Sequence, residues 1–249
     1  MKRKEDQIVI SIIIATYNAE EHLLKCLESI RQQRFKGIEI IVIDAKSDDD
    51  TITILRSFKY DALSWISEPD LGIYDALNKG INKAKGDWFY FLGSDDYLLE
   101  GFSDLAENLV DKHTIYYGES ESHYSGEKPD YEILKGSFSS YRLTKYCINH
   151  QSILYPASIF QVYRYDLKYK VFADYALNLK LWGDRRLKKV HIATSIVSYN
   201  MNGFSSVTQD EQFLRDKPKI IRKYMGFFIY SRYMLRRYKR RLRGYIDYG

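Results

Sequence analysis

Short continuous apolar runs alternate with longer segments in which apolar residues recur every three or four positions. The runs at residues 8–15 and 38–43 predict buried strands, the first apolar on both faces. Residues 63–66 predict a short third strand, and residues 88–92 a fourth, apolar one. The periodic segments predict helices at 20–33 and 74–84, with an amphipathic segment around Ile52, Leu55 and Phe58. Such alternation predicts an α/β fold with a single, mainly parallel sheet flanked by helices.

The pattern loosens after about residue 113, where tyrosines are frequent and periodicity is weak. It recovers with a predicted helix near Ala173 to Trp182 and two short predicted strands between Lys189 and Tyr199. We therefore expect one main domain at 1–226, with halves at about 8–112 and 113–226, and a separate C-terminal tail at 227–249.

Polar residues follow each of the first four predicted strands. They are Thr16-Tyr17-Asn18, Asp44, Glu68 to Asp70, and Ser94-Asp95-Asp96. Ligands of parallel sheets bind outside the carboxyl ends of the strands, so these groups are expected to converge on one edge of the sheet.

The chain has 249 residues and 45% hydrophobic content, enough for one sizeable core. Its two cysteines, Cys26 and Cys147, match no metal-ligand spacing and predict neither a disulfide framework nor a zinc site, which makes a reducing cytoplasm the expected location. The charged start and apolar run at 8–15 resemble a signal peptide. We do not expect one, because the run contains a serine and lacks a small-residue cleavage site. No apolar stretch approaches the roughly 18 residues of a membrane-spanning helix.

The net charge of +5 comes from the tail, where residues 232–243 hold seven Lys or Arg and no acid. The rest of the chain has 31 basic and 33 acidic residues and so carries no excess of positive charge. A nucleic-acid partner, which would favour a basic surface on the folded domain, is therefore not expected. From Phe227 onward an apolar stripe recurs at helical spacing opposite the bases, at Met234, Tyr238, Leu242 and Tyr245. Two interpretations stay open: this basic amphipathic helix lies on an anionic membrane surface, or it packs its stripe on the domain.

Asp95 and Asp96 form a pair of hard oxygen ligands at the end of an apolar strand. One or two carboxylates together with phosphate oxygens are sufficient to hold Mg²⁺ or Mn²⁺. The alternative is a turn that caps the next helix.

Several blocks of the chain together resemble the signatures of family 2 glycosyltransferases, in both order and spacing. They are Ile14-Ala15-Thr16-Tyr17-Asn18; Val42-Ile43-Asp44 with Ser47-Asp48; Glu68-Pro69-Asp70 through Gly80; Gly86-Asp87; and Phe91-Leu92-Gly93-Ser94-Asp95-Asp96. The resemblance covers residues 8–100 strongly and 145–206 more weakly. It implies the GT-A fold, an inverting reaction and a nucleotide-sugar donor, with a UDP-sugar favoured.

The resemblance also implies roles for individual residues. Tyr17 would offer a ring face to the donor's base, and Asp44 would accept hydrogen bonds from the base or ribose. Asn18 is in addition expected to N-cap the following helix. The complete donor set is Ala15, Thr16, Tyr17, Asn18, Asp44, Asp75, Asn78 and Ser94. The alternatives are a packed turn aromatic for Tyr17, turn chemistry for Asp44, and a solvated helix surface for Asp75 and Asn78.

The carboxylate pair departs from the family's Asp-x-Asp-Asp motif, because Gly93 occupies the first position. Asp95 and Asp96 are left to bind the metal. In the second block Ala45 and Lys46 stand where the family usually has glycines.

Asp174 aligns with the family's catalytic base, at the start of a helix that contains Trp182. Ala173 stands where the family often has Glu, and an ordinary acidic residue in the first helical turn is the alternative. His150 and Gln151 would line the acceptor site. Gly203 with Ser205 and Ser206 resembles the family's loop over the diphosphate.

The sequence thus predicts an inverting, metal-dependent glycosyltransferase that builds surface polysaccharide on a glycan or lipid-linked acceptor. We expect it in the cytoplasm, with the tail as a candidate peripheral contact to the inner face of the membrane. A non-catalytic nucleotide-sugar-binding or scaffold protein is the alternative. A nucleotidyltransferase and a dinucleotide dehydrogenase are disfavoured, since no Gly-rich phosphate loop follows the first strand.

Overall fold

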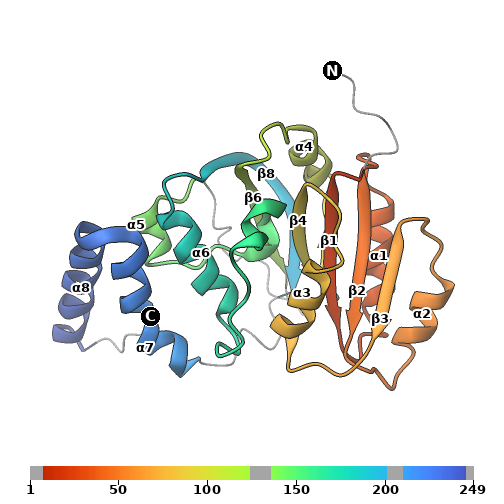
Figure 1. Ribbon diagram of the computed structural model, residues 1–249, viewed down its shortest axis with the longest axis horizontal. Helices are drawn as coiled ribbons and strands as arrows, with labels where there is room; N and C mark the ends of the chain where they lie inside the picture. The colour runs from red at the N-terminus through yellow and green to blue at the C-terminus, as the bar shows by residue number, and fades with distance from the viewer. Residues whose placement is uncertain (1–7, 124–135, 201–209, 245–249) are drawn as a thin grey trace.

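The computed structural model describes residues 8–123, 136–200 and 210–244 and forms one mixed sheet flanked by helices (Figure 1). The strand order is β3-β2-β1-β4-β7-β6-β8-β5. The strands are β1 (Ile10–Thr16), β2 (Ile38–Asp44), β3 (Leu63–Ser67), β4 (Trp88–Gly93), β5 (Tyr97–Leu98), β6 (Thr114–His123), β7 (Ile153–Pro156) and β8 (Lys188–Asn200). The predicted single α/β sheet is confirmed.

The helices lie between and after these strands. They are α1 (Leu23–Arg31), α2 (Thr51–Ser57), α3 (Ile73–Ile81), α4 (Gly101–Glu107), α5 (Ser140–Leu143), α6 (Ala173–Gly183), α7 (Glu211–Ile220) and α8 (Gly226–Leu242). Short 3-10 turns cover His150–Ser152 and Ala157–Gln161, and a π-helix covers Ile221–Met225.

The four strands predicted from apolar runs all form, and β1 pairs in parallel with both β2 and β4. Beyond them the sheet is mixed, because β7 runs antiparallel to its neighbours β4 and β6. The prediction of two short strands between Lys189 and Tyr199 is wrong, since one strand, β8, spans the segment. It pairs along the whole length of β6, which keeps it extended.

Successive residues of β1 and β2 point into two different cores, as a strand's twofold repeat requires. Ile13 and Ile41 belong to the core that includes α3 and α6, whereas Ile12 and Ile40 belong to the core that includes α1 and α4. On the first face α3 lies very close to the sheet, because a Cβ at Gly80 would stand 2.4 Å from Cγ2 of Ile13.

The parallel strands end at the same level. Thr16 is in register with Asp44, Asp44 with Ser67, and Ala15 with Gly93. This register brings the polar residues that follow the strands to one edge of the sheet, as the sequence predicts.

Helix α8 lies at one end of the molecule, and β3 with α2 lies at the other (Figure 1). One face of α8 packs on the domain: Tyr233 is buried, and Ile229, Tyr230 and Met234 contact the α3–α6 core. The buried Lys217 of α7 places its Nζ 4.7 Å from the ring centre of Tyr175 in α6 and 5.9 Å from that of Tyr233. Helices α6, α7 and α8 therefore form one packed unit.

Candidate functional site

Asp44 connects the ends of three strands. Its fully buried carboxylate accepts hydrogen bonds from the hydroxyls of Thr16 at 3.2 Å, Ser47 at 2.5 Å and Ser67 at 2.6 Å, and from the Ser47 amide at 3.1 Å. These bonds offset the cost of burying a charge. The side chain that the family resemblance assigns to the donor is therefore also the hydrogen-bonding centre of this edge.

The loop after β1 is tied to the loop after β2. The Asn18 amide donates to the Ser47 hydroxyl at 2.8 Å, and Oδ1 of Asn18 accepts from the Asp48 amide at 3.1 Å. Asn18 adopts a positive φ of 48°, a conformation that asparagine tolerates better than most residues. The predicted N-cap role of Asn18 is wrong, because α1 begins at Leu23 with His22 at its N-cap.

Tyr17 extends from this loop with 66% of its surface exposed. An aromatic ring in that position is accessible to a ligand at the sheet edge, and it is not the packed turn residue of the alternative interpretation. Thr16 is buried and donates to Asp44, while Ala15 is half-buried.

Two other predicted donor residues, Asp75 and Asn78, lie on α3 and have partners within the protein. Asp75 accepts from the Leu71 amide at 3.1 Å and forms an ion pair with Lys79 at 3.4 Å. Asn78 donates to the backbone carbonyl of Tyr165 at 2.9 Å and accepts from its amide at 3.1 Å. Both side chains therefore hold neighbouring segments in position, and their contact with a donor stays a prediction.

The carboxylate pair follows β4 in a turn closed by the Asp96 amide and the Gly93 carbonyl. Asp96 is buried, accepting from the Asn200 amide at 2.6 Å and from Nε2 of Gln151 at 2.5 Å. Ser94 and Asp95 are half-buried, and Asp95 accepts from Nδ2 of Asn200 at 3.3 Å. Asp95 thus presents the more accessible carboxylate of the pair.

Gly93 explains how Asp96 reaches this position. A Cβ at residue 93 would stand 2.3 Å from Oδ2 of Asp96 and 3.0 Å from Oδ1 of Asp95. The Asp96 carboxylate therefore occupies the space that a side chain at position 93 would need, so the turn in this conformation accommodates glycine there.

The electrostatics of the pair favour a cation. Burial raises the pKa of Asp96 to about 7, and the nearby Asp95 carboxylate adds to the rise, against hydrogen bonds from Asn200 and Gln151. A divalent ion between the two carboxylates would relieve this repulsion. In the part of the chain that the structure describes, no group of three or more His, Cys, Asp or Glu side chains could hold a metal alone. The pair consequently fits Mg²⁺ or Mn²⁺ only if a ligand's phosphates complete the coordination.

Asp174, the predicted base, lies in the first turn of α6 and is buried. Its Oδ1 accepts from the Tyr74 hydroxyl at 2.8 Å, and its Oδ2 lies 3.2 Å from Nδ1 of His150. Burial raises the pKa of Asp174, but hydrogen bonds from His150, Tyr74 and the Tyr175 amide together hold it below its ordinary value. The carboxylate is therefore ionised at neutral pH, as a proton acceptor must be.

His150 and Gln151 link the two groups of carboxylates. His150 contacts Asp174, and the adjacent Gln151 donates to Asp96 while its Oε1 accepts from the Gly93 amide at 2.9 Å. Gln151 is only 3% exposed, so both ends of its amide are used within the protein. Its predicted acceptor contact stays a prediction, and its observed contacts are with the Asp95–Asp96 turn.

Three residues of this site were not singled out from the sequence. Tyr74 and Asn200 lie about a hundred residues from their carboxylate partners, and Ser67 is the last residue of the short strand β3. The involvement of each residue becomes visible only in the folded protein, where its element lies beside the carboxylate that it contacts. Gly203, Ser205 and Ser206, the predicted loop over the diphosphate, lie outside the described residues.

The sequence matches the model of the glycosyl transferase family 2 over residues 11–172. A glycosyltransferase of PGL/p-HBAD biosynthesis from Mycobacterium tuberculosis is 32% identical over 221 residues, which are 84% of each chain.

Solved structures share the fold. The glycosyltransferase TarS of S. aureus, residues 1–349 in complex with UDP, superposes with a TM-score of 0.74 at 18% identity, covering 93% of this chain and 72% of that one. The mannosyltransferase PcManGT of Pyrobaculum calidifontis, in complex with GDP-Man and Mn²⁺, gives a TM-score of 0.56 at 15% identity, covering 77% and 56%. These neighbours have the GT-A fold, which confirms the fold expected from the resemblance.

Proposed function

Because the chain belongs to the glycosyl transferase family 2, we propose that it transfers a sugar from a nucleotide-diphosphate donor to an acceptor hydroxyl with inversion at the anomeric carbon. The observation that carries this proposal is the His150-Gln151 pair, which connects Asp174 to the Asp95–Asp96 turn at one sheet edge. A base and a diphosphate-binding group must act on the same sugar from opposite sides. The donor half is then 8–112 and the acceptor half 113–226.

In the proposed reaction the acceptor oxygen attacks the anomeric carbon as the bond from that carbon to the diphosphate oxygen breaks. Asp174 takes the proton of the attacking hydroxyl, and the electron pair of the broken bond leaves with the nucleotide diphosphate. His150 and Tyr74 hold the carboxylate in position and keep it ionised until it accepts the proton. Single-step displacement of this kind inverts the sugar.

Asp95 and Asp96 would hold Mn²⁺ or Mg²⁺ against the diphosphate, where the ion supplies positive charge to the leaving group. Gln151 and Asn200 orient Asp96, leaving Asp95 as the more accessible ligand. Tyr17, with its exposed ring, would stack on the donor's base. The hydrogen-bonded loops after β1 and β2 hold that ring at the sheet edge.

We favour a UDP-sugar as donor and a glycan or lipid-linked saccharide as acceptor. The TarS complexes with UDP and with UDP-GlcNAc support the uridine nucleotide, although PcManGT holds GDP-Man on the same fold. Relatives that act in PGL/p-HBAD biosynthesis support a role in glycan assembly, and we extend this to surface polysaccharide. No helix among the described residues is long and apolar enough to cross a bilayer. We place the reaction in the cytoplasm, at the inner face of the membrane.

A panel of UDP- and GDP-sugars with mixed glycan acceptors, read by mass spectrometry of the products, tests the proposal. Transfer from one donor, abolished by Asp174→Asn, is the expected result. Nucleotide binding without transfer or donor hydrolysis under all conditions would favour the non-catalytic alternative.

A further inference from the structure

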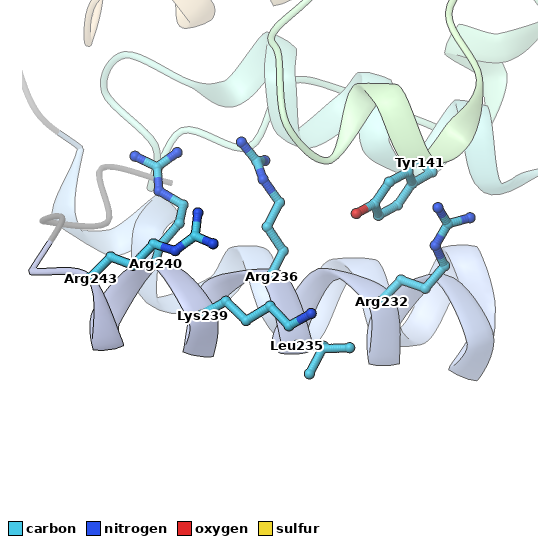
Figure 2. A pocket seen from close by; sticks show the side chains of 7 residues that line it. All are labelled: Tyr141, Arg232, Leu235, Arg236, Lys239, Arg240 and Arg243. Atoms are coloured by element: carbon cyan, nitrogen blue, oxygen red, sulfur yellow. The ribbon is translucent and has the colours of Figure 1, made fainter.

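A groove of about 540 Å³ runs between α5 and α8 (Figure 2). Figure 2 shows Tyr141 of α5 beside Arg232, with the other lining side chains spaced along α8. The lining of the groove contains no acidic residue and consists of Tyr141, Leu235, Arg232, Arg236, Lys239, Arg240 and Arg243. Five bases in one groove favour an anionic ligand.

Most of this charge is not neutralised within the protein. Among the residues that the structure describes, no ion pair joins Arg232, Arg236, Lys239 or Arg243 to a carboxylate. Arg232 instead lies over the Tyr141 ring, 4.0 Å from its centre, which orients its guanidinium at the groove. Like charges at helical spacing repel one another, so an anion that bridges them would be stabilised. Guanidinium groups bind phosphate oxygens in pairs, and phosphate is the chemistry that the groove fits.

An exposed apolar stripe runs beside the groove on the same helix. Its members are Phe227, Phe228, Leu235, Tyr238 and Leu242, all between 55% and 76% exposed. At 100° per residue these five positions fall within an arc of roughly 100° around the helix axis. Leu235 belongs to both the stripe and the groove lining, so the two surfaces are continuous.

The stripe is not the face that attaches α8 to the domain. Tyr233 and its neighbours pack on the core from the other side of the helix, so one face of the tail packs on the domain, and its contact with a membrane stays a prediction. Met234 packs on the domain, Tyr238 and Leu242 are exposed, and Tyr245 lies outside the described residues. A small soluble phosphate compound, such as inorganic phosphate or a nucleotide, would occupy only the groove and would leave the five exposed apolar side chains without a function.

We propose that the α5–α8 groove binds the phosphate of anionic phospholipids while the apolar stripe enters the boundary between headgroups and acyl chains. A basic face adjoining large apolar side chains on one helix is the pattern of interfacial membrane helices. The inference deepens the peripheral location proposed above and does not depend on the transfer chemistry.

The connection between α8 and α6 would also fix the position of the candidate base, Asp174, relative to a bound bilayer. Helix α8 follows the π-helix Ile221–Met225, whose Tyr224 carbonyl lies so close to Gly183 that a Cβ there would stand 2.3 Å away. Gly183 ends α6, and Asp174 lies in the first turn of the same helix. With 11 residues, α6 spans ~16 Å at 1.5 Å per residue. A membrane contact at α8 would therefore set the distance of Asp174 from the bilayer through one rigid helix.

Sedimentation of the full chain with vesicles tests the proposal, comparing phosphatidylcholine alone with phosphatidylcholine plus phosphatidylglycerol. We expect binding only to the anionic vesicles and a fall of about tenfold or more in Arg232→Gln/Arg236→Gln, since each base near such a surface adds ~1 kcal/mol. Leu235→Gln/Leu242→Gln should weaken binding at unchanged charge. Arg56→Gln/Lys59→Gln should bind as wild type does, because these exposed bases lie in and just after α2, the helix at the opposite end of the molecule from α8 (Figure 1).

Thermal melting of each variant separates loss of binding from loss of folding, and a soluble-acceptor transfer assay keeps this test distinct from that of the proposed function. Equal binding to neutral and anionic vesicles, or unchanged binding in the arginine variant, would overturn the proposal. So would groove-dependent binding of soluble glycerol phosphate or of an RNA oligonucleotide without any vesicle binding. Should every folded variant sediment as wild type does, α8 is only a structural helix.

Discussion

Nδ1 of His150 lies 3.2 Å from Oδ2 of Asp174, at a buried position where a carboxylate would otherwise tend to be protonated. Burial raises the pKa of Asp174, but this contact, together with hydrogen bonds from Tyr74 and the Tyr175 amide, brings it below the ordinary value. The same imidazole belongs to the residue preceding Gln151, which contacts Asp96. Two consecutive residues thus contact the proposed base and the proposed diphosphate-binding turn.

Asp174→Asn should lower kcat by at least ~10²-fold, because the amide keeps the shape of the carboxylate and removes its basicity. Binding of nucleotide diphosphate, measured by calorimetry, should stay near that of the wild type. A variant with unchanged turnover would remove Asp174 from the mechanism. Asp166→Asn, at a half-buried carboxylate that pairs with Lys168, is the matched control.

His150→Phe should move the acidic limb of the pH–rate profile to higher pH. Loss of the imidazole removes an influence that lowers the pKa of Asp174, while the burial that raises it remains. The base must be ionised to act, so the variant should lose activity on acidification at a pH where the wild type is still active. The pH dependence of kcat for both proteins measures the shift. The control variant His113→Phe, at an exposed site, should have the same acidic limb as the wild type. A limb that moves to lower pH would contradict the assignment.

Chelation by EDTA and the substitution Asp95→Asn should each reduce the affinity for nucleotide diphosphate by about tenfold or more. Asp95 is the sharper test, because Asp96→Ala would also release the hydrogen bonds from Asn200 and Gln151. Titration calorimetry with added Mn²⁺ measures the effect. Equal affinity under all conditions would exclude a metal-bridged diphosphate.

Gly93→Asp recreates the family's motif and should nonetheless weaken Mn²⁺-dependent nucleotide binding. The new Cβ would stand 2.3 Å from Oδ2 of Asp96 and force that carboxylate from its contact with Gln151. Calorimetry against wild type decides the direction. Tighter binding would contradict the importance of the space at Gly93 for the geometry of the Asp95–Asp96 turn.

Asp44→Ala should lower the free energy of unfolding by about 2–4 kcal/mol, since the hydroxyls of Thr16, Ser47 and Ser67 lose their shared acceptor in a buried position. Urea denaturation measures the loss. Asp61→Ala, at an exposed loop position, provides the control and should change stability little. A stable Asp44→Ala protein that fails to bind nucleotide would assign Asp44 to the donor alone.

The sequence was most informative where local pattern and fold agree. Continuous apolar runs identify β1, β2 and β4, because strands buried on both faces need apolar side chains at nearly every position. Their polar ends then identify the edge that holds Asp44 and Asp96. The edge strand β3 is only partly buried, and its short run contains Ser64. The long strand β6 was missed because its pairing partner, β8, lies far along the chain and its own residues are mixed.

Side-chain partners were harder to predict than elements. Nothing near Tyr74 in sequence indicates Asp174, and nothing near Asn200 indicates Asp96, because each pair is formed by elements that meet only in the folded sheet. The tail illustrates a second limit. Apolar residues surround more than one face of α8, and spacing alone does not tell which of Met234 and Leu242 contacts the core.

The position of β8 has a consequence for the order in which the protein is assembled during synthesis. β5, directly after the Asp95–Asp96 turn, pairs with β8 at Leu98 and Val197, and Asp96 takes a hydrogen bond from Asn200 at the end of the same strand. A nascent chain that has emerged only as far as β7 can pair β1 to β4 but has no neighbour for β5. Pairing between β5 and β8 closes a long stretch of chain, which is slower than pairing between strands close in sequence. The donor half can therefore fold early on the ribosome, whereas the Asp95–Asp96 turn acquires its final geometry only after residue 200 has been released.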